Sequence, residues 1–153
     1  MKAKGILIPI GGNEDKGIET SDFHKLEYIE EGILARVVKE SGGRSANIVV
    51  IPTASSYPVE VGENYLNAFR KLGCEKVTVL DIRKRKEAED QHNLELIRNT
   101  DCVMFSGGDQ SKIIKIIGGT SMHDLLLDKY INQPFVIAGT SAGAMCMLSL
   151  IHI

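Results

Sequence analysis

The chain has 153 residues, of which 43% are hydrophobic and 25% are charged. This length suits one domain with one core, and the composition is typical of a soluble globular protein rather than a disordered or membrane protein. The formal net charge of −2 arises from mixed acidic and basic residues, so we expect neither a nucleic acid nor a membrane as a partner.

Short apolar runs rich in Val and Ile alternate with longer segments of helical period. The strands expected from these runs are 5–10, 47–52, 76–82, 102–106 and 135–139. Nearly continuous apolar runs predict strands that are covered on both faces, as in a parallel sheet. The first run, Ile6 to Ile10, is too short for a signal peptide or a membrane span, and we therefore expect a cytoplasmic protein.

Segments of helical period separate the strands. Residues 24–43 predict a helix that is closed by Gly42, because glycine commonly follows the last turn of a helix. The apolar face of that segment consists of Leu26, Ile29, Ile33, Val37 and Val38. Residues 58–73 repeat the pattern between Pro58 and Gly73. The side chains expected to face inward there are Leu66, Phe69 and Leu72.

The second half of the chain predicts three more helices. These cover residues 89–100, 110–120 and 122–130, the last two separated by Gly118 and Gly119. The charged run 83–90 is interpreted as a solvated loop and a helix start. The three cysteines, Cys74, Cys102 and Cys146, lack the C-x-x-C spacing of metal and redox sites, and we expect reduced, mostly buried thiols.

The alternation of strands and helices predicts an α/β three-layer sandwich with a mainly parallel sheet. In such folds ligands bind outside the carboxyl ends of the strands. Loops rich in Gly, Ser or Thr follow four of the expected strands: GGNEDKG (11–17), TASSYP (53–58), SGGDQ (106–110) and TSAGA (140–144). These loops should meet at one edge and form a pocket rich in backbone N–H groups.

The segment G-T-S-A-G at 139–143 fits the nucleophile-elbow pattern G-x-S-x-G between a strand and a helix. A sharp turn there strains the serine backbone, and the two glycines leave room for it. Ser141 would be exposed as the nucleophile, with the N–H of Ala142 as an oxyanion donor. The alternative is structural, with Ser141 near the cap of a closely packed helix.

The segment FSGGDQ (105–110) supplies further candidate site residues. Its glycines allow a backbone N–H to approach a ligand closely, so Gly107 or Gly108 is a candidate second oxyanion donor. Asp109 and Gln110 are candidate substrate-binding residues. A helix cap is the favoured interpretation of Asp109, whereas the Gln110 amide can both donate to and accept from a substrate.

The other two loops carry weaker signals. Residues 10–17 resemble half of a dinucleotide fingerprint but lack its third glycine, which excludes that cofactor. Glu14, Asp15 or Lys16 would reach the pocket rim or form a solvated turn. Residues 53–58 are interpreted as an ordinary turn whose hydroxyls bond backbone groups, with substrate contact as the alternative. We expect no metal and no organic cofactor.

A serine is a nucleophile at neutral pH when a base, usually a histidine oriented by a carboxylate, takes its proton. The four histidines are His24, His92, His123 and His152. None follows an expected strand with an acid nearby, so each is expected at the surface. The residues therefore predict a nucleophile without its base.

The segments IGGNEDK, IPTASSYPVEVGENYLNAFRKLG, FSGGDQ and GTSAGA, in this order, resemble the cyanophycinases, serine peptidases grouped with the aspartyl dipeptidases. The resemblance extends to Met147. It implies a flavodoxin-like or class I glutamine-amidotransferase-like fold, a homodimer, and hydrolysis of β-linked aspartyl-arginine units of the storage polymer cyanophycin. It also implies that Ser141 is the nucleophile, Gln110 a substrate-pocket residue, and Ala142 and the SGG turn the oxyanion donors.

In that family the histidine base and its acidic partner lie downstream of the serine, whereas this chain continues for a dozen residues after Ser141. The last six residues, LSLIHI (148–153), match the translation of a transposase sequencing adapter. We therefore expect a single domain over 1–147 that is truncated at its C-terminus, and a chain that is inactive alone. The alternatives are an aspartyl dipeptidase of the same family and a non-catalytic relative that binds an aspartyl or arginyl ligand.

Overall fold

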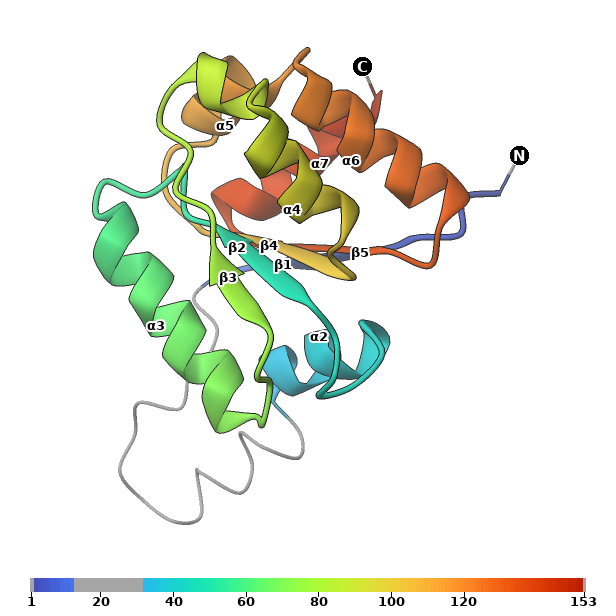
Figure 1. The fold of residues 1–153 in the computed structure, drawn as a ribbon. Helices are drawn as coiled ribbons and strands as arrows, with labels where there is room; N and C mark the ends of the chain where they lie inside the picture. The colour runs from blue at the N-terminus through green and yellow to red at the C-terminus, as the bar shows by residue number, and fades with distance from the viewer. Residues whose placement is uncertain (1, 13–31, 153) are drawn as a thin grey trace.

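The computed structural model describes residues 2–12 and 32–152 (Figure 1). Within them, five strands form one sheet: β1 (Ile6–Ile10), β2 (Ile48–Ile51), β3 (Val77–Val79), β4 (Cys102–Phe105) and β5 (Val136–Thr140). Their order is β1-β5-β4-β2-β3, and every pairing is parallel. All five predicted strands are confirmed, although β3 is shorter than the predicted 76–82.

Helices cover both faces of the sheet. One face packs against α2 (Ile33–Glu40) and α3 (Pro58–Lys71). The other packs against α4 (Gln91–Arg98), α5 (Gln110–Ile117), α6 (Ser121–Asn132) and α7 (Ala142–His152), with a short 3₁₀ helix, η1 (Arg85–Ala88), before α4. Figure 1 shows the sheet between these two helical layers. The predicted three-layer α/β sandwich is confirmed.

Alternate residues of the central strands pack into two separate cores. Val49, Ile51, Val103 and Phe105 belong to the core beneath α4–α7. Ile48, Val50, Cys102 and Met104 belong to the core beneath α2 and α3. Because successive side chains of a strand point to opposite faces, a strand covered on both sides must be apolar at every position. This explains the uninterrupted apolar runs of β2 and β4.

The predicted helices 58–73, 89–100, 110–120 and 122–130 are present as α3, α4, α5 and α6. The described part of the predicted helix 24–43 is shorter than expected, because Gly32 is extended and α2 begins at Ile33, which is exposed rather than on the apolar face. Gly42 (φ 108°) and Gly73 (φ 88°) follow the ends of α2 and α3. Leu26 and Ile29 lie outside the described residues. On α3, Phe69 is buried as predicted, but Leu66 is only half buried and its neighbour Tyr65 occupies the core instead.

One prediction about polar residues near the end of α5 was confirmed and one was wrong. Arg85, in the charged run, is exposed as predicted, and its guanidinium also donates to the carbonyl oxygens of Lys115, Gly118 and Gly119. His123 is buried rather than exposed, and its Nδ1 accepts the N–H of Gly119 at 3.0 Å. Both side chains satisfy backbone groups that the α5–α6 connection leaves open.

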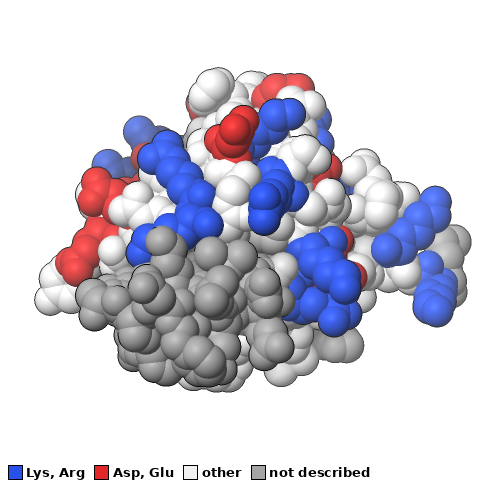
Figure 2. All heavy atoms as spheres, turned by 90° about the horizontal axis from the view of Figure 1, so that it is seen from below, with Lys and Arg blue, Asp and Glu red and all other residues white. Residues whose placement is uncertain are grey.

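The described surface carries charges of both signs. Figure 2 shows Lys and Arg side chains in several separate groups, with Asp and Glu side chains on the same face. None of the helices in the described residues is long and apolar enough to cross a membrane.

Lys129 is a buried cation that joins α6 to the segment between α4 and β4. Its Nζ donates to the carbonyl oxygens of Arg98 (2.7 Å) and Thr100 (2.8 Å) and lies 4.8 Å from the centre of the Phe135 ring. Burial of the ammonium group lowers the pKa of Lys129 below its usual value. The two carbonyls depend on this ammonium for their hydrogen bonds.

Replacing Lys129 by Met should therefore lower the free energy of unfolding by about 1–3 kcal/mol, the usual cost of leaving buried polar groups unsatisfied. Urea denaturation followed by circular dichroism measures this change. Lys115→Met, at an exposed position of α5, is the control and should change stability by less than about 0.5 kcal/mol. Equal losses in both variants would contradict the structural role of Lys129.

Candidate active site

Ser141 occupies a strained turn between β5 and α7. Its φ is 50°, and among the described residues it is the only non-glycine residue with a positive φ. This left-handed conformation costs an L-residue about 1–3 kcal/mol and persists only where the surroundings impose it. Here the N–H of Ser141 donates to the Ile10 carbonyl (2.8 Å), and the Ser141 carbonyl accepts from Met145 (2.9 Å). The turn predicted from G-x-S-x-G is present.

The two flanking glycines allow α7 to approach the sheet closely. A Cβ atom on Gly139 would lie 2.5 Å from the carbonyl carbon of Gly143. A Cβ atom on Gly143 would lie 2.6 Å from the carbonyl oxygen of Phe105 on β4. Real side chains do not tolerate such distances, so both positions require glycine. The close approach leaves Ser141 exposed at the carboxyl edge while Ala142 is buried.

The SGGDQ turn lies beside this serine. A Cβ atom on Gly107 would be 3.8 Å from the Ser141 Cβ and 3.5 Å from the Thr140 carbonyl oxygen. Within the described part of the chain, the N–H groups of Gly107 and Ala142 have no acceptor. Both N–H groups are therefore available to a ligand beside Ser141.

Gly108 has a different neighbour from Gly107. It has φ 136°, and a Cβ atom there would lie 2.1 Å from the carbonyl oxygen of Ala54. The next residue, Asp109, donates its N–H to the same oxygen at 2.8 Å. Gly108 thus joins the turn to the 53–58 loop, and Gly107 is the glycine that the structure brings to Ser141.

Asp109 and Gln110 begin α5. The Asp109 carboxylate accepts the N–H of Ser111 at 2.8 Å, which makes it the N-cap. Hydrogen bonds from Ser111 hold the pKa of Asp109 below its usual value. Gln110 is half buried, and its amide has no hydrogen-bond partner among the described residues. The cap interpretation of Asp109 fits this geometry, and Gln110 keeps its capacity to bind a ligand.

A buried hydroxyl pair supports the turn from the opposite face of the sheet. Tyr65 of α3 and Thr140, the last residue of β5, place their hydroxyl oxygens 3.2 Å apart. Both side chains are buried, and the Tyr65 ring stacks on Phe69 at 6.4 Å. Sequence reasoning missed Tyr65, although its position four residues before Phe69 places the two rings on one helix face.

The described residues provide no base for Ser141. No side chain among them hydrogen-bonds to the Ser141 hydroxyl, His92 is exposed on α4, and His123 bonds to the backbone of Gly119. His24 and the predicted rim residues Glu14, Asp15 and Lys16 lie outside the described residues, and the side chain of His152 is also not described. The arrangement can support nucleophilic attack and oxyanion binding once a base is supplied.

Cys146, one turn beyond the elbow, is a poor nucleophile. Burial raises the pKa of its thiol to about 12, and the Sγ atom donates to the Gly143 carbonyl at 3.0 Å. The thiol therefore stays protonated at neutral pH. Among the described residues, no three His, Cys, Asp or Glu side chains are grouped so that they could hold a metal ion.

The sequence model of peptidase family S51 matches residues 18–153, which is most of the chain. The chain belongs to peptidase family S51. It is 32% identical over 144 residues to the cyanophycinase of Trichormus variabilis, covering 94% of this chain and 45% of that protein. The cyanophycinase of Geminocystis herdmanii is 31% identical, with 92% and 48% covered. This S51 chain spans about half the length of the curated relatives that it matches.

Solved structures share this fold. The crystal structure of a peptidase from an acI-B1 actinobacterium superposes with a TM-score of 0.68 at 25% identity, covering 94% of this chain and 56% of that one. A peptidase E-type protein of Listeria monocytogenes gives a TM-score of 0.54 at 21% identity, covering 76% and 55%. The second similarity concerns the fold alone.

The lowered pKa of Asp109 predicts a pH dependence of stability. A carboxyl whose folded-state pKa is depressed stabilises the fold above its ordinary pKa, and the contribution disappears as the pH falls through the folded-state value. The melting temperature of Asp109→Ala should thus lie below that of the unmodified chain at pH 7, and the difference should shrink toward pH 3. Asp128→Ala, at an exposed position of α6, is the control. A difference that does not change with pH would contradict this cap.

The three cysteines should resist thiol reagents in the folded protein. All three are free and buried, and burial raises the pKa values of Cys74, Cys102 and Cys146, the last two to about 12. At pH 8 we expect no fast reaction with dithionitrobenzoate, and three reactive thiols after unfolding in guanidinium. Rapid modification of Cys146 in the folded protein would contradict the packing of α7.

Proposed function

We propose that this S51 chain carries the nucleophile of a serine hydrolase that cleaves cyanophycin to β-aspartyl-arginine dipeptides. The observation that carries the proposal is the geometry of Ser141, an exposed hydroxyl on a strained turn beside two N–H groups without acceptors. The substrate assignment is supported by the cyanophycinases that are 31–32% identical to this chain.

The reaction begins at the Ser141 hydroxyl. Its oxygen attacks the scissile carbonyl carbon while a base removes its proton, and the carbonyl oxygen becomes an oxyanion. The N–H groups of Ala142 and Gly107 donate to that oxyanion, with the N-terminus of α7 adding its positive potential. The carbon–nitrogen bond then breaks, the base returns its proton to the leaving amine, and water hydrolyses the acyl-enzyme.

The base is assigned to a residue outside the described part of the chain, because the described histidines do not reach Ser141. The resemblance to the cyanophycinases supports a histidine that lies downstream in sequence. Reading the source DNA across the Met147 codon, by a method without the adapter, tests this assignment. A frame that continues into a histidine and an acid supports a base downstream of Met147, whereas a stop directly after Ile153 contradicts a downstream base.

Substitution of Ser141 tests the proposed mechanism on the polypeptide encoded by the verified reading frame. Ser141→Ala should lower kcat on cyanophycin by about 10³-fold or more, because the nucleophile is lost. Ser45→Ala, at an exposed position away from the candidate site, should keep full activity. Release of β-aspartyl-arginine measured by chromatography reports turnover, and equal turnover in both variants would overturn the nucleophile assignment.

Two other functions predict different results. An aspartyl dipeptidase of this family would hydrolyse short aspartyl dipeptides faster than cyanophycin. A non-catalytic relative is favoured by one observation, that the described residues supply no base to Ser141. Such a protein would hydrolyse neither substrate, would not react with a fluorophosphonate probe at Ser141, and would bind its ligand equally well in Ser141→Ala.

A further inference from the structure

A polar cleft lies at the carboxyl edge of the sheet, near the ends of β2 and β3. It has a volume of about 360 Å³, and its polar lining consists of Thr53, Ser55, Ser56, Asp81, Arg83 and Lys112. These residues come from the loop before α3, the segment after β3 and the first turn of α5. None of them belongs to the Ser141 turn, so the cleft is a separate feature of this edge.

The SGGDQ turn connects this cleft to Ser141. Gly107 lies beside Ser141, whereas Gly108 packs against the backbone of Ala54 and Ser55. A Cβ atom on Gly108 would lie 2.9 Å from the Ser55 nitrogen, and Ser55 lines the cleft. The two glycines of one turn therefore separate the cleft from Ser141, so a peptide that extends past this turn can contact both.

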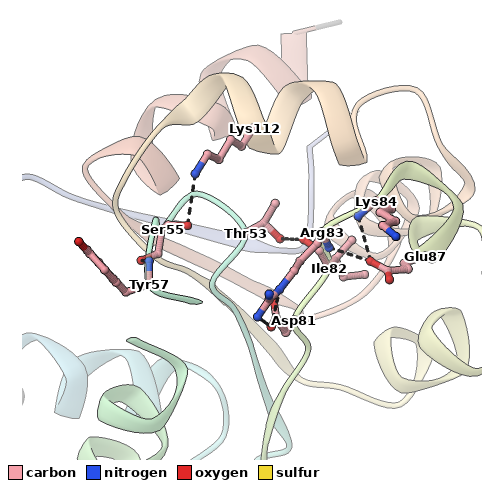
Figure 3. A network of polar contacts seen from close by, with 9 residues as sticks. All are labelled: Thr53, Ser55, Tyr57, Asp81, Ile82, Arg83, Lys84, Glu87 and Lys112. Carbon is pink, nitrogen blue, oxygen red and sulfur yellow. Dashed lines mark hydrogen bonds and ion pairs between the residues drawn. The ribbon is translucent and has the colours of Figure 1, made fainter. Parts of the chain in front are cut away.

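Most of the polar groups in the cleft are hydrogen-bond donors. Both carboxylate oxygens of Asp81 accept from Arg83, at 2.6–3.1 Å, so the only acidic side chain of the lining is already paired. Figure 3 shows these two side chains together, with Lys112 extending from α5 toward Ser55. The Nη1 group of Arg83 has no partner among the described residues.

Lys112 provides the unneutralised charge. Its Nζ makes one long hydrogen bond, 3.4 Å, to the Ser55 carbonyl, and no carboxylate of the described residues lies in ion-pair distance. With Asp81 and Arg83 cancelling each other, the cleft has a net charge of about +1. The Thr53 hydroxyl already donates to the Ile82 carbonyl at 2.8 Å. The Lys112 ammonium, the Arg83 Nη1 group and the serine hydroxyls of the lining together favour a carboxylate ligand.

We propose that this cleft is a distal subsite that binds a carboxylate of the peptide substrate, on the other side of the SGGDQ turn from the bond attacked by Ser141. The proposal rests on the proposed function, because it takes the peptide to be the molecule held at Ser141. Lys112 pairs with the carboxylate directly, and Arg83 is held in place by Asp81. The subsite would favour longer chains, which carry carboxylates beyond the bond at Ser141, over dipeptides.

Equilibrium binding tests the subsite apart from catalysis. The probe is fluorescein-labelled tetra-aspartate, with labelled tetra-asparagine as its uncharged counterpart, and fluorescence polarisation on the Ser141→Ala chain measures Kd. Lys112→Met should raise the Kd for tetra-aspartate about tenfold, the effect of one charge-assisted hydrogen bond. Lys112→Arg should restore binding, and Lys115→Met, on the same helix, should leave it unchanged. Tetra-asparagine should bind weakly to every variant.

The outcomes separate the subsite from the proposed function. Equal Kd values for tetra-aspartate in the Ser141→Ala chain with and without Lys112→Met would overturn the subsite. Competition by succinate at the same concentration as tetra-aspartate would also overturn it, because it would indicate a site for a free dicarboxylate. Lys112-dependent binding in a protein that never hydrolyses cyanophycin would support the subsite while the hydrolase function fails. In an active enzyme, Lys112→Met should raise KM for cyanophycin and leave kcat unchanged.

Discussion

The close approach of α7 to the sheet is the constraint on which the candidate site depends. Gly139 and Gly143 have no side chains, so the first turn of α7 contacts β4 and β5 at distances that any Cβ atom would prevent. The chain can join β5 to a helix this close only through a tight turn, and Ser141 takes a positive φ there. The Tyr65–Thr140 hydroxyl pair fixes the end of β5 from below. The exposed hydroxyl is thus a consequence of backbone packing.

The parallel sheet brings separate loops to this turn. Since β4 and β5 are neighbours and run in the same direction, their carboxyl ends place Gly107 and Ser141 side by side. β2 lies next to β4, which brings the 53–58 loop against Gly108. One edge therefore carries the Ser141 turn, the candidate oxyanion donors and the polar cleft. A peptide held along this edge would contact all three.

The surroundings of Ser141 and the polar cleft differ in charge. Neutral backbone N–H groups and a helix N-terminus surround Ser141, which suits a charge that develops only during reaction. Whole charges, on Lys112, Arg83 and Asp81, lie in the cleft farther away. The buried thiol of Cys146 stays protonated and does not compete with the serine. The chain thus combines a nearly uncharged candidate site at Ser141 with a charged cleft along the same edge.

The sequence by itself determined the sheet, the helices that cover it and the elbow, because apolar period, helix-end glycines and G-x-S-x-G are local patterns with local causes. The N-cap role of Asp109 was likewise predicted from its position before a helix. Only the tertiary structure decided which glycine adjoins Ser141, that Tyr65 rather than Leu66 enters the core, and that His123 and Arg85 bind backbone groups. The cleft of Lys112, Arg83 and Asp81 was also invisible in the sequence. Those outcomes depend on strand order and on contacts between residues far apart in the chain, which periodicity does not encode.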